Sequence, residues 1–263
     1  LTYLFVYLGI LIIKIKVMRV KTVKMKDLSF DPNLFRPMST GRAIDSHFSS
    51  TKGIMRGTNY AIVGDPGVGK TTVMLDILAD LHRKGQKVLF ISGEMNSIDM
   101  YGYVKRYPKF GDLPILFMGD HCEENCLEVI EDVLIEGWDC VLIDSMAEIV
   151  NGVMDTTKGY MSSKKAESEI LNLFERHNKA ENISEINTCF LVIQQVTKMG
   201  NFAGSNRFKH MMTGMAHMKF TPDGRIFYFS KNRRGGVHDA RLFNLAPRNR
   251  VGWMGTLAMN EIE

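Results

Sequence analysis

The stretch GDPGVGKTT at residues 64–72 carries the residue types that bind nucleotide phosphates. It fits the pattern G-x-x-x-x-G-K-[ST], with an apolar run before it and helical spacing of apolar residues after it. Glycines let the backbone curl so that its N–H groups point at phosphate oxygens, and the following helix N-terminus adds partial positive charge. The flanking strand and helix argue against an accidental glycine-rich turn. We therefore predict nucleotide binding by Gly64, Asp65, Pro66, Gly67, Val68, Gly69, Lys70, Thr71 and Thr72.

Three side chains are expected to hold the phosphates and a magnesium ion. Lys70 can reach the β- and γ-phosphates, and the hydroxyl group of Thr71 can ligate Mg²⁺. Asp144 closes an apolar run, where a carboxylate can hold Mg²⁺ through Thr71 or through water. The alternative for Asp144 is a helix cap or a solvated strand end. Together these residues predict ATP and Mg²⁺ as cofactors.

Polar residues at the ends of two other apolar runs are candidates for catalysis. Glu94 follows one run, and a carboxylate there can orient or deprotonate an attacking water. Asp99 is the weaker candidate, because capping of the next helix explains it better. Gln195 ends another run and can hydrogen-bond the γ-phosphate or the water. Gln194 alternates to the other face, and the choice between the two glutamines stays open.

A third candidate group is the basic sequence KNRRGG at residues 231–236. Two or three cations before a glycine turn are compatible with a solvated strand end. Lys231 and Arg233 could instead reach a γ-phosphate bound by a neighbouring subunit. A cation supplied in this way is worth about 10³ to 10⁵ in rate.

Apolar strand-like runs alternate with helix-like segments from residue 60 onward. Continuous apolar strands between helices predict an α/β fold with a mostly parallel, twisted sheet and helices on both faces. After residue 210 the pattern changes to a β-hairpin, which we expect as antiparallel strands at the sheet edge. The expected strands are 60–63, 87–92, 113–118, 139–144, 187–195, 215–220 and 225–230, and the expected helices are 73–81, 98–107, 126–136 and 166–177.

The amino-acid composition limits the possible functions less than the motifs do. The chain has 263 residues, a net charge of +4 and a pI near 8.8, which permit a nucleic-acid partner without demonstrating one. The four cysteines form no C-x-x-C pair, and His121, Cys122 and Cys126 lack an evident fourth metal ligand. Reduced cysteines in a nucleotide-binding chain indicate a cytoplasmic location.

The first residues of the chain are unusual. Residues 1–13 are strongly apolar but too short to span a membrane, so no membrane partner is expected. Two explanations stay open. The true start could be Met18 or Met25, with a gene-calling artefact before it, or the segment could be a β-strand that pairs with the sheet or with a neighbouring subunit.

The ordered motifs resemble the RecA/DnaB-type P-loop ATPases, and most closely the RadA (Sms) branch. The segments that carry this resemblance are STG at 39–41 with Ile44-Asp45, GDPGVGKTT at 64–72, FISGEM at 90–95, VLIDS at 141–145, QVTKMGNFAG at 195–204 and KNRRGG at 231–236. Two residues depart from the RadA pattern, because Gln195 replaces a histidine and Arg234 replaces a phenylalanine. RadA proteins usually carry an N-terminal four-cysteine zinc element and a C-terminal protease-like domain, neither of which is seen in these 263 residues, so we expect a single-domain relative of the kind found in phage genomes.

The resemblance implies a RecA-like ATPase domain at residues 36–263 after an N-terminal extension at residues 1–35. It implies a ring or filament with ATP between subunits, where Lys231 and Arg233 act on the neighbour's ATP. It also implies a path for single-stranded DNA along the loops after Asp144 and Gln195. The first loop contains Lys158, Tyr160, Lys164 and Lys165, and the residues expected to contact DNA from the second are Lys198, Asn201, Phe202, Arg207, Phe208 and Lys209. Local packing of the phenylalanines is the alternative.

Three functions are compatible with these observations. The first is an ATPase that binds single-stranded DNA in recombination, repair or replication, in the cytoplasm of a bacterial host and with other proteins of those processes. The second is a replicative helicase core of the DnaB type. The third is a KaiC-like regulator that binds nucleotide to control its own assembly and does not bind DNA.

Overall fold

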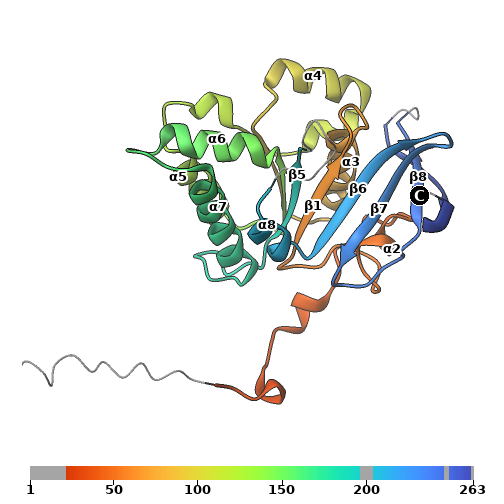
Figure 1. Ribbon diagram of the computed structural model, residues 1–263, viewed down its shortest axis with the longest axis horizontal. Coiled ribbons are helices and arrows are strands. Elements are labelled where there is room, and N and C mark those ends of the chain that lie inside the picture. The colour runs from red at the N-terminus through yellow and green to blue at the C-terminus, as the bar shows by residue number, and fades with distance from the viewer. Residues whose placement is uncertain (1–21, 196–203, 246–248, 262–263) are drawn as a thin grey trace, which may run out of the picture. The chain divides into compact units, whose positions relative to one another are not determined.

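The computed structural model describes residues 22–195, 204–245 and 249–261 (Figure 1). The chain divides into two compact units, residues 1–31 and residues 32–263. The described part of the first unit holds one short 3-10 helix, Met25–Asp27. The second unit contains all the strands and helices discussed below.

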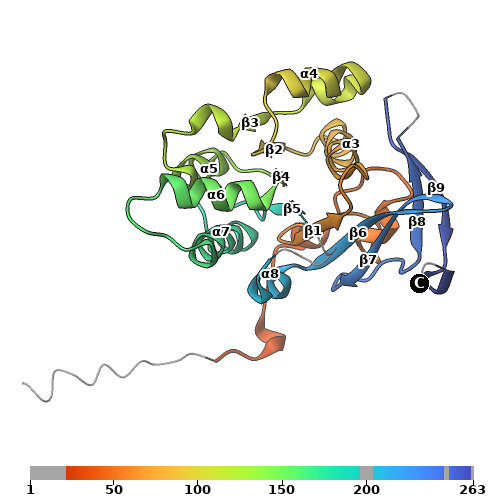
Figure 2. The same cartoon turned by 45° about the horizontal axis from the view of Figure 1, so that its top comes forward.

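One mixed sheet forms the centre of the second unit (Figure 2). Its strands are β1 (Asn59–Gly64), β2 (Val88–Ser92), β3 (Ile115–Phe117), β4 (Cys140–Asp144), β5 (Cys189–Gln194), β6 (Gly214–Thr221), β7 (Gly224–Asn232), β8 (Ala240–Asn244) and β9 (Gly252–Leu257). Their order across the sheet is β3-β2-β4-β5-β1-β6-β7-β8-β9. The strands from β3 to β6 in this order are parallel, and β7, β8 and β9 continue the sheet as antiparallel strands. The predicted α/β fold with a mostly parallel sheet is therefore confirmed.

The hairpin joins the sheet differently from the prediction. β6 and β7 pair in an antiparallel manner as expected, but β6 also pairs with β1 in parallel. The parallel core therefore includes β6, and the antiparallel extension begins only at β7. Gly214 permits this close approach, because a Cβ there would lie 2.7 Å from the ring of Tyr60.

Helices cover both faces of the parallel strands. They are α2 (Asp45–Phe48), α3 (Lys70–Arg83), α4 (Ser97–Arg106), α5 (Cys126–Ile135), α6 (Met146–Thr156), α7 (Ser163–Asn178) and α8 (Asn206–Met211), with 3-10 helices η2 (Pro32–Phe35), η3 (Pro108–Asp112), η4 (Met118–His121) and η5 (Met259–Glu261). α2, α3 and η3 contribute to one core with Ile62 of β1, and α5 to α8 contribute to the other with Val63. Alternate side chains of one strand thus reach two separate cores.

Two helices occupy positions where the sequence analysis expected loops. α6 begins just after Asp144 and buries Met146, Ile149 and Val153 at helical spacing. α8 lies within the segment expected to contact DNA, and its six residues are too few to show a clear helical period. Both helices therefore limit which side chains of these segments can reach a ligand.

Two buried aspartates of α3 hold distant segments of the chain together. Asp76 accepts hydrogen bonds from Arg42, from Nζ of Lys109 at 2.7 Å and from the backbone N–H of Val251 at 2.8 Å. Asp80 also accepts from Lys109, at 2.8 Å. The segment before α2, the helix η3 and the connection between β8 and β9 are thereby tied to the helix that begins at the phosphate loop.

A buried histidine on α2 predicts acid sensitivity. His47 is fully buried, and burial, with the nearby charge of Arg241, lowers its pKa from 6.5 to about 4. Between those pH values the unfolded chain binds a proton that the folded chain does not, so stability falls as pH falls. From pH 7 to pH 4 this residue should remove about 3 kcal/mol of unfolding free energy.

Urea unfolding at pH 7 and pH 4.5 checks this expectation. His47→Gln should lose less stability between the two pH values than the wild-type protein, because glutamine does not titrate in this range. His177 and His217, whose pKa values burial also lowers, serve as internal background in both proteins. An equal loss in both proteins would show that His47 is not the titrating group.

Candidate functional site

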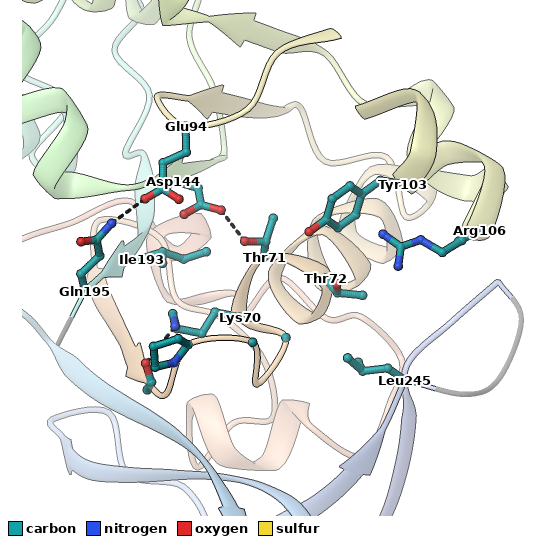
Figure 3. Close-up of a pocket in the computed structure, with 14 residues that line it drawn as sticks. Lys70, Thr71, Thr72, Glu94, Tyr103, Arg106, Asp144, Ile193, Gln195 and Leu245 are labelled. Carbon is teal, nitrogen blue, oxygen red and sulfur yellow. Dashed lines mark hydrogen bonds between the residues drawn. The ribbon is translucent and has the colours of Figure 1, made fainter. Parts of the chain in front are cut away.

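The phosphate loop joins β1 to α3 at the carboxyl end of the parallel strands (Figure 3). β1 ends at Gly64 and α3 begins at Lys70, as the motif predicts. Gly67 and Gly69 have φ values of +75° and +103°, which residues with a side chain rarely adopt. Nζ of Lys70 donates to the carbonyl oxygens of Gly64, at 2.8 Å, and Asp65, at 3.0 Å. The ammonium group is therefore held within the loop, where phosphate oxygens could replace these carbonyls.

Thr71 and Asp144 meet from α3 and β4. Oγ1 of Thr71 donates to Oδ2 of Asp144 at 2.5 Å. Burial raises the pKa of Asp144 to about 6; the bond from Thr71 and the charge of Lys70 oppose this rise, and the charge of Glu94 adds to it. A hydroxyl group and a carboxylate are the hard oxygen ligands that Mg²⁺ prefers, and the ion's charge would offset the cost of burying the carboxylate. These residues therefore fit a magnesium ion.

Glu94 and Gln195 face each other in the same cavity (Figure 3). Nε2 of Gln195 donates to Oε1 of Glu94 at 2.9 Å, and both side chains are exposed. Gln194 is buried, because successive side chains of a strand point to opposite faces. The structure thus brings Gln195, and not Gln194, beside Glu94. Asp99 belongs to the capping box at the start of α4, which agrees with its expected structural role.

A cavity of about 610 Å³ gathers these groups. Burial lowers the pKa of Lys70, while the carboxylates of Asp144, Glu94 and Asp65 oppose that shift. Val68 is fully buried and anchors the phosphate loop in the core. The cavity lining consists of Gly64, Pro66, Gly67, Gly69, Lys70, Thr71, Thr72, Glu94, Tyr103, Arg106, Asp144, Ile193, Gln195 and Leu245.

Four lining residues were missed by the sequence analysis: Ile193 of β5, Tyr103, Arg106 and Leu245. Tyr103 and Arg106 lie one helical turn apart on α4, with the guanidinium carbon 4.9 Å from the centre of the ring. Leu245 lies over the phosphate loop, where a Cβ on Gly69 would be 2.6 Å from Leu245 Cδ1, and its carbonyl accepts from the hydroxyl of Tyr107 at 2.9 Å. A flat ring, a planar cation and an apolar side chain can hold a nucleobase. The three-residue spacing of Tyr103 and Arg106 in an expected helix could have indicated that the two side chains share a face. Nothing in the sequence around Leu245 indicates that it contacts the phosphate loop.

The comparison with protein families agrees with this site. A model of the RecA N-terminal domain matches residues 16–228. The chain belongs to the RecA N-terminal domain family. It is therefore a RecA-like P-loop ATPase, and family membership implies that it binds a nucleotide.

Curated relatives of this RecA-like ATPase are DNA repair proteins named RadA. The chain is 28% identical over 202 residues to RadA of Campylobacter jejuni. This aligned region is 76% of this chain and 42% of the relative. The chain is also 28% identical over 199 residues to RadA of Listeria monocytogenes. That aligned region is 73% of this chain and 40% of the relative. The matched region thus spans less than half the length of these relatives.

Solved structures with the same fold include two archaeal proteins. The flagellar accessory protein FlaH of Methanocaldococcus jannaschii matches with a TM-score of 0.63 and 12% identity, covering 84% of this chain and all of FlaH. A KaiC-like protein of Pyrococcus horikoshii matches with a TM-score of 0.59 and 17% identity, covering 84% of this chain and 99% of that protein. At these identities the likeness shows the fold alone. Within the described residues, this RecA-like ATPase has no helix with the length and apolar character needed to cross a bilayer.

The two predicted trans-acting cations donate hydrogen bonds to α8 of their own chain. Nζ of Lys231 donates to the carbonyl oxygen of Lys209 at 2.6 Å, and Nη2 of Arg233 donates to that of His210 at 2.9 Å. Both acceptors lie near the C-terminal end of α8, where helix carbonyls lack partners. Neither cation is among the described residues that line the cavity of the RecA-like ATPase.

The residues that were expected to contact DNA fall into three groups: those outside the described residues, one that is buried and two that are exposed. Lys198, Asn201 and Phe202 lie outside the described residues. Phe208 is fully buried in the core that α7 and α8 share, so the prediction that it contacts DNA is wrong and the alternative of local packing holds. It faces the core because one side of α8 packs against α7.

Arg207 and Lys209 are exposed on the other side of α8. Arg207 donates to the Oγ of Ser168 and, at 2.6 Å, to Oδ1 of Asn172, both on α7. A hollow of about 310 Å³ lies beside it at the start of α7, lined by Ser162, Lys164, Lys165, Glu167, Ser168, Ser205 and Arg207. Residues from the two predicted DNA-contact segments thus line one hollow in this RecA-like ATPase.

Proposed function

We propose that this RecA-like ATPase hydrolyses ATP with Mg²⁺ and binds single-stranded DNA in recombination, repair or replication. It acts as a ring or filament in the bacterial cytoplasm, with ATP between neighbouring copies. The observation that carries the proposal is the meeting of Lys70, Thr71, Asp144, Glu94 and Gln195 in one cavity. The naming of the curated relatives as DNA repair proteins supports the choice of process.

The cavity supplies what in-line attack of water on the γ-phosphate requires. Glu94 orients the water and accepts its proton, while Lys70 neutralises charge on the transferred phosphate. Thr71 and Asp144 would hold Mg²⁺, which would supply further positive charge to the phosphates. Nε2 of Gln195 carries two N–H groups, so one can stay on Glu94 while the other donates to a γ-phosphate or to the water.

The hollow beside α7 supports binding of a DNA backbone. Three cations and one carboxylate line it, and the serine hydroxyl groups around them can donate to phosphate oxygens. Glu167 already accepts a hydrogen bond from the backbone N–H of Ser205 at 3.3 Å and one from its Oγ, which reduces its repulsion toward an anion. The net positive charge of the hollow favours a phosphate backbone over a neutral ligand.

The proposal is tested by ATP turnover and DNA binding on the same preparations. Single-stranded DNA should stimulate turnover at low salt. Replacing both Lys164 and Lys165 with alanine should weaken DNA binding. It should also make the plot of log binding constant against log salt concentration less steep by about 1.4, because each of the two lost phosphate contacts contributes about 0.7 to this salt slope. Lys84→Ala, an exposed lysine at the end of α3, is the matched control.

The outcome also separates the other two functions. Nucleotide-dependent assembly with no DNA stimulation and an unchanged salt slope would contradict DNA binding and favour the KaiC-like regulator. Directional unwinding of a forked duplex by the protein alone would favour the DnaB-like helicase core. Absence of ATP turnover under all conditions would contradict the proposal as a whole.

A further inference from the structure

Asn232 fastens the basic turn, residues 231–236, to the end of α2. Its Nδ2 donates to the carbonyl oxygens of His47, at 2.9 Å, and Phe48, at 3.0 Å. These are the last two residues of α2, whose carbonyls have no partner within the helix. Its Oδ1 accepts from the backbone N–H of Arg234 at 2.9 Å. One side chain therefore caps the helix and shapes the turn.

Backbone contacts complete this attachment. The N–H of Ser50 donates to the carbonyl of Arg234 at 3.1 Å, and the N–H of Val237 donates to the carbonyl of Ser46 at 2.9 Å. Gly236 has a φ of +115°, and a Cβ there would lie 2.5 Å from the carbonyl oxygen of His47. The backbone of the basic turn is thus held at both ends against α2 and the residues that flank it.

The cations of the basic turn contact α8, whereas its backbone contacts α2 and the residues that flank α2. Asn232 ends β7, so its side chain points to the opposite face from that of Lys231. Arg233 is exposed, and both cations donate to backbone carbonyls of α8. A phosphate is a stronger partner for such cations than a neutral carbonyl, because both donor and acceptor are then charged. The two side chains can therefore exchange α8 for an anion while the backbone stays in place.

We propose that Asn232 is the positioning residue that directs Lys231 and Arg233 toward a nucleotide held by a second copy of this chain. This inference rests on the proposed function, in which that nucleotide lies between copies. A purely structural role, in which Asn232 only stabilises the end of α2, is the competing explanation. The two differ in what a neighbouring subunit can restore.

The test compares Asn232→Ala with Arg233→Ala in steady-state ATP turnover and in mixing experiments. We expect Asn232→Ala to lower kcat about 10²-fold, as a misplacement of about 1 Å does, with KM for ATP unchanged. Added Glu94→Gln subunits carry an intact basic turn, so they should restore turnover at the ATP sites of Asn232→Ala subunits. Asn151→Ala, an exposed position on α6, is the matched control and should keep full turnover.

Each outcome decides between the explanations. Loss of turnover in Asn232→Ala without restoration, while Arg233→Ala is restored, assigns Asn232 a structural role and overturns the inference alone. If Asn232→Ala keeps full turnover while Arg233→Ala loses it, Asn232 does not position the cations, and the inference alone is overturned. Full turnover in both variants overturns action between copies and the inference with it. If Asn232→Ala does not fold, Asn232→Asp carries the same test, because it keeps the acceptor for Arg234 but loses both donated bonds.

Discussion

The Glu94→Gln protein is expected to bind ATP as tightly as the wild type and to hydrolyse it about 10²- to 10⁴-fold more slowly. Glutamine keeps the size of the side chain and can still orient a water, but an amide cannot accept a proton. Rapid-mixing measurement of kcat beside equilibrium binding of ATP separates the two effects. The change should appear in kcat alone, because the phosphates are held by the loop before α3.

Glu148→Gln is the matched control for this substitution. Glu148 is a partly exposed carboxylate in the first turn of α6. It lies close to Gly93, the neighbour of Glu94 in sequence, because a Cβ added to Gly93 would be 2.9 Å from the Cβ of Glu148. It does not line the cavity among the described residues, so its replacement should leave turnover unchanged. A larger loss in Glu148→Gln than in Glu94→Gln would identify Glu148 as the base.

The Arg233→Ala protein is expected to lose about 10³- to 10⁵-fold in turnover as a homogeneous assembly. The guanidinium does not line its own chain's cavity, so under the proposed function it would contribute at a neighbour's γ-phosphate. Mixing with Glu94→Gln subunits should restore turnover, because each variant supplies the part that the other lacks. Turnover measured across mixing ratios should pass through a maximum at an intermediate composition.

Arg234→Ala is the control for charge in the basic turn. Arg234 is exposed, and it contributes its backbone groups to the contact with α2. Its loss should change turnover only slightly. If Arg233→Ala gains nothing from Glu94→Gln subunits at any ratio, Arg233 does not act between copies and its role is confined to α8.

Much of the phosphate site could be predicted because it is local in sequence. The glycines, Lys70 and Thr71 lie within one turn between β1 and α3, and their spacing alone decides which backbone groups converge. Asp144 was identifiable for a similar reason, since continuous apolar runs place strand ends at one edge of a parallel sheet. The cap made by Asp99 also depends only on neighbours along the chain.

The amino-acid sequence by itself determined the phosphate loop, the strands from β1 to β7 with helices α3, α4, α5 and α7 between them, and the family. Tertiary structure decided everything that depends on two distant segments meeting. It selected Gln195 over Gln194, buried Phe208, added β6 to the parallel strands and brought Leu245 over the phosphate loop. The physical reason is that spacing along a chain encodes local geometry, whereas register between strands and packing between faces arise only when the whole core is buried.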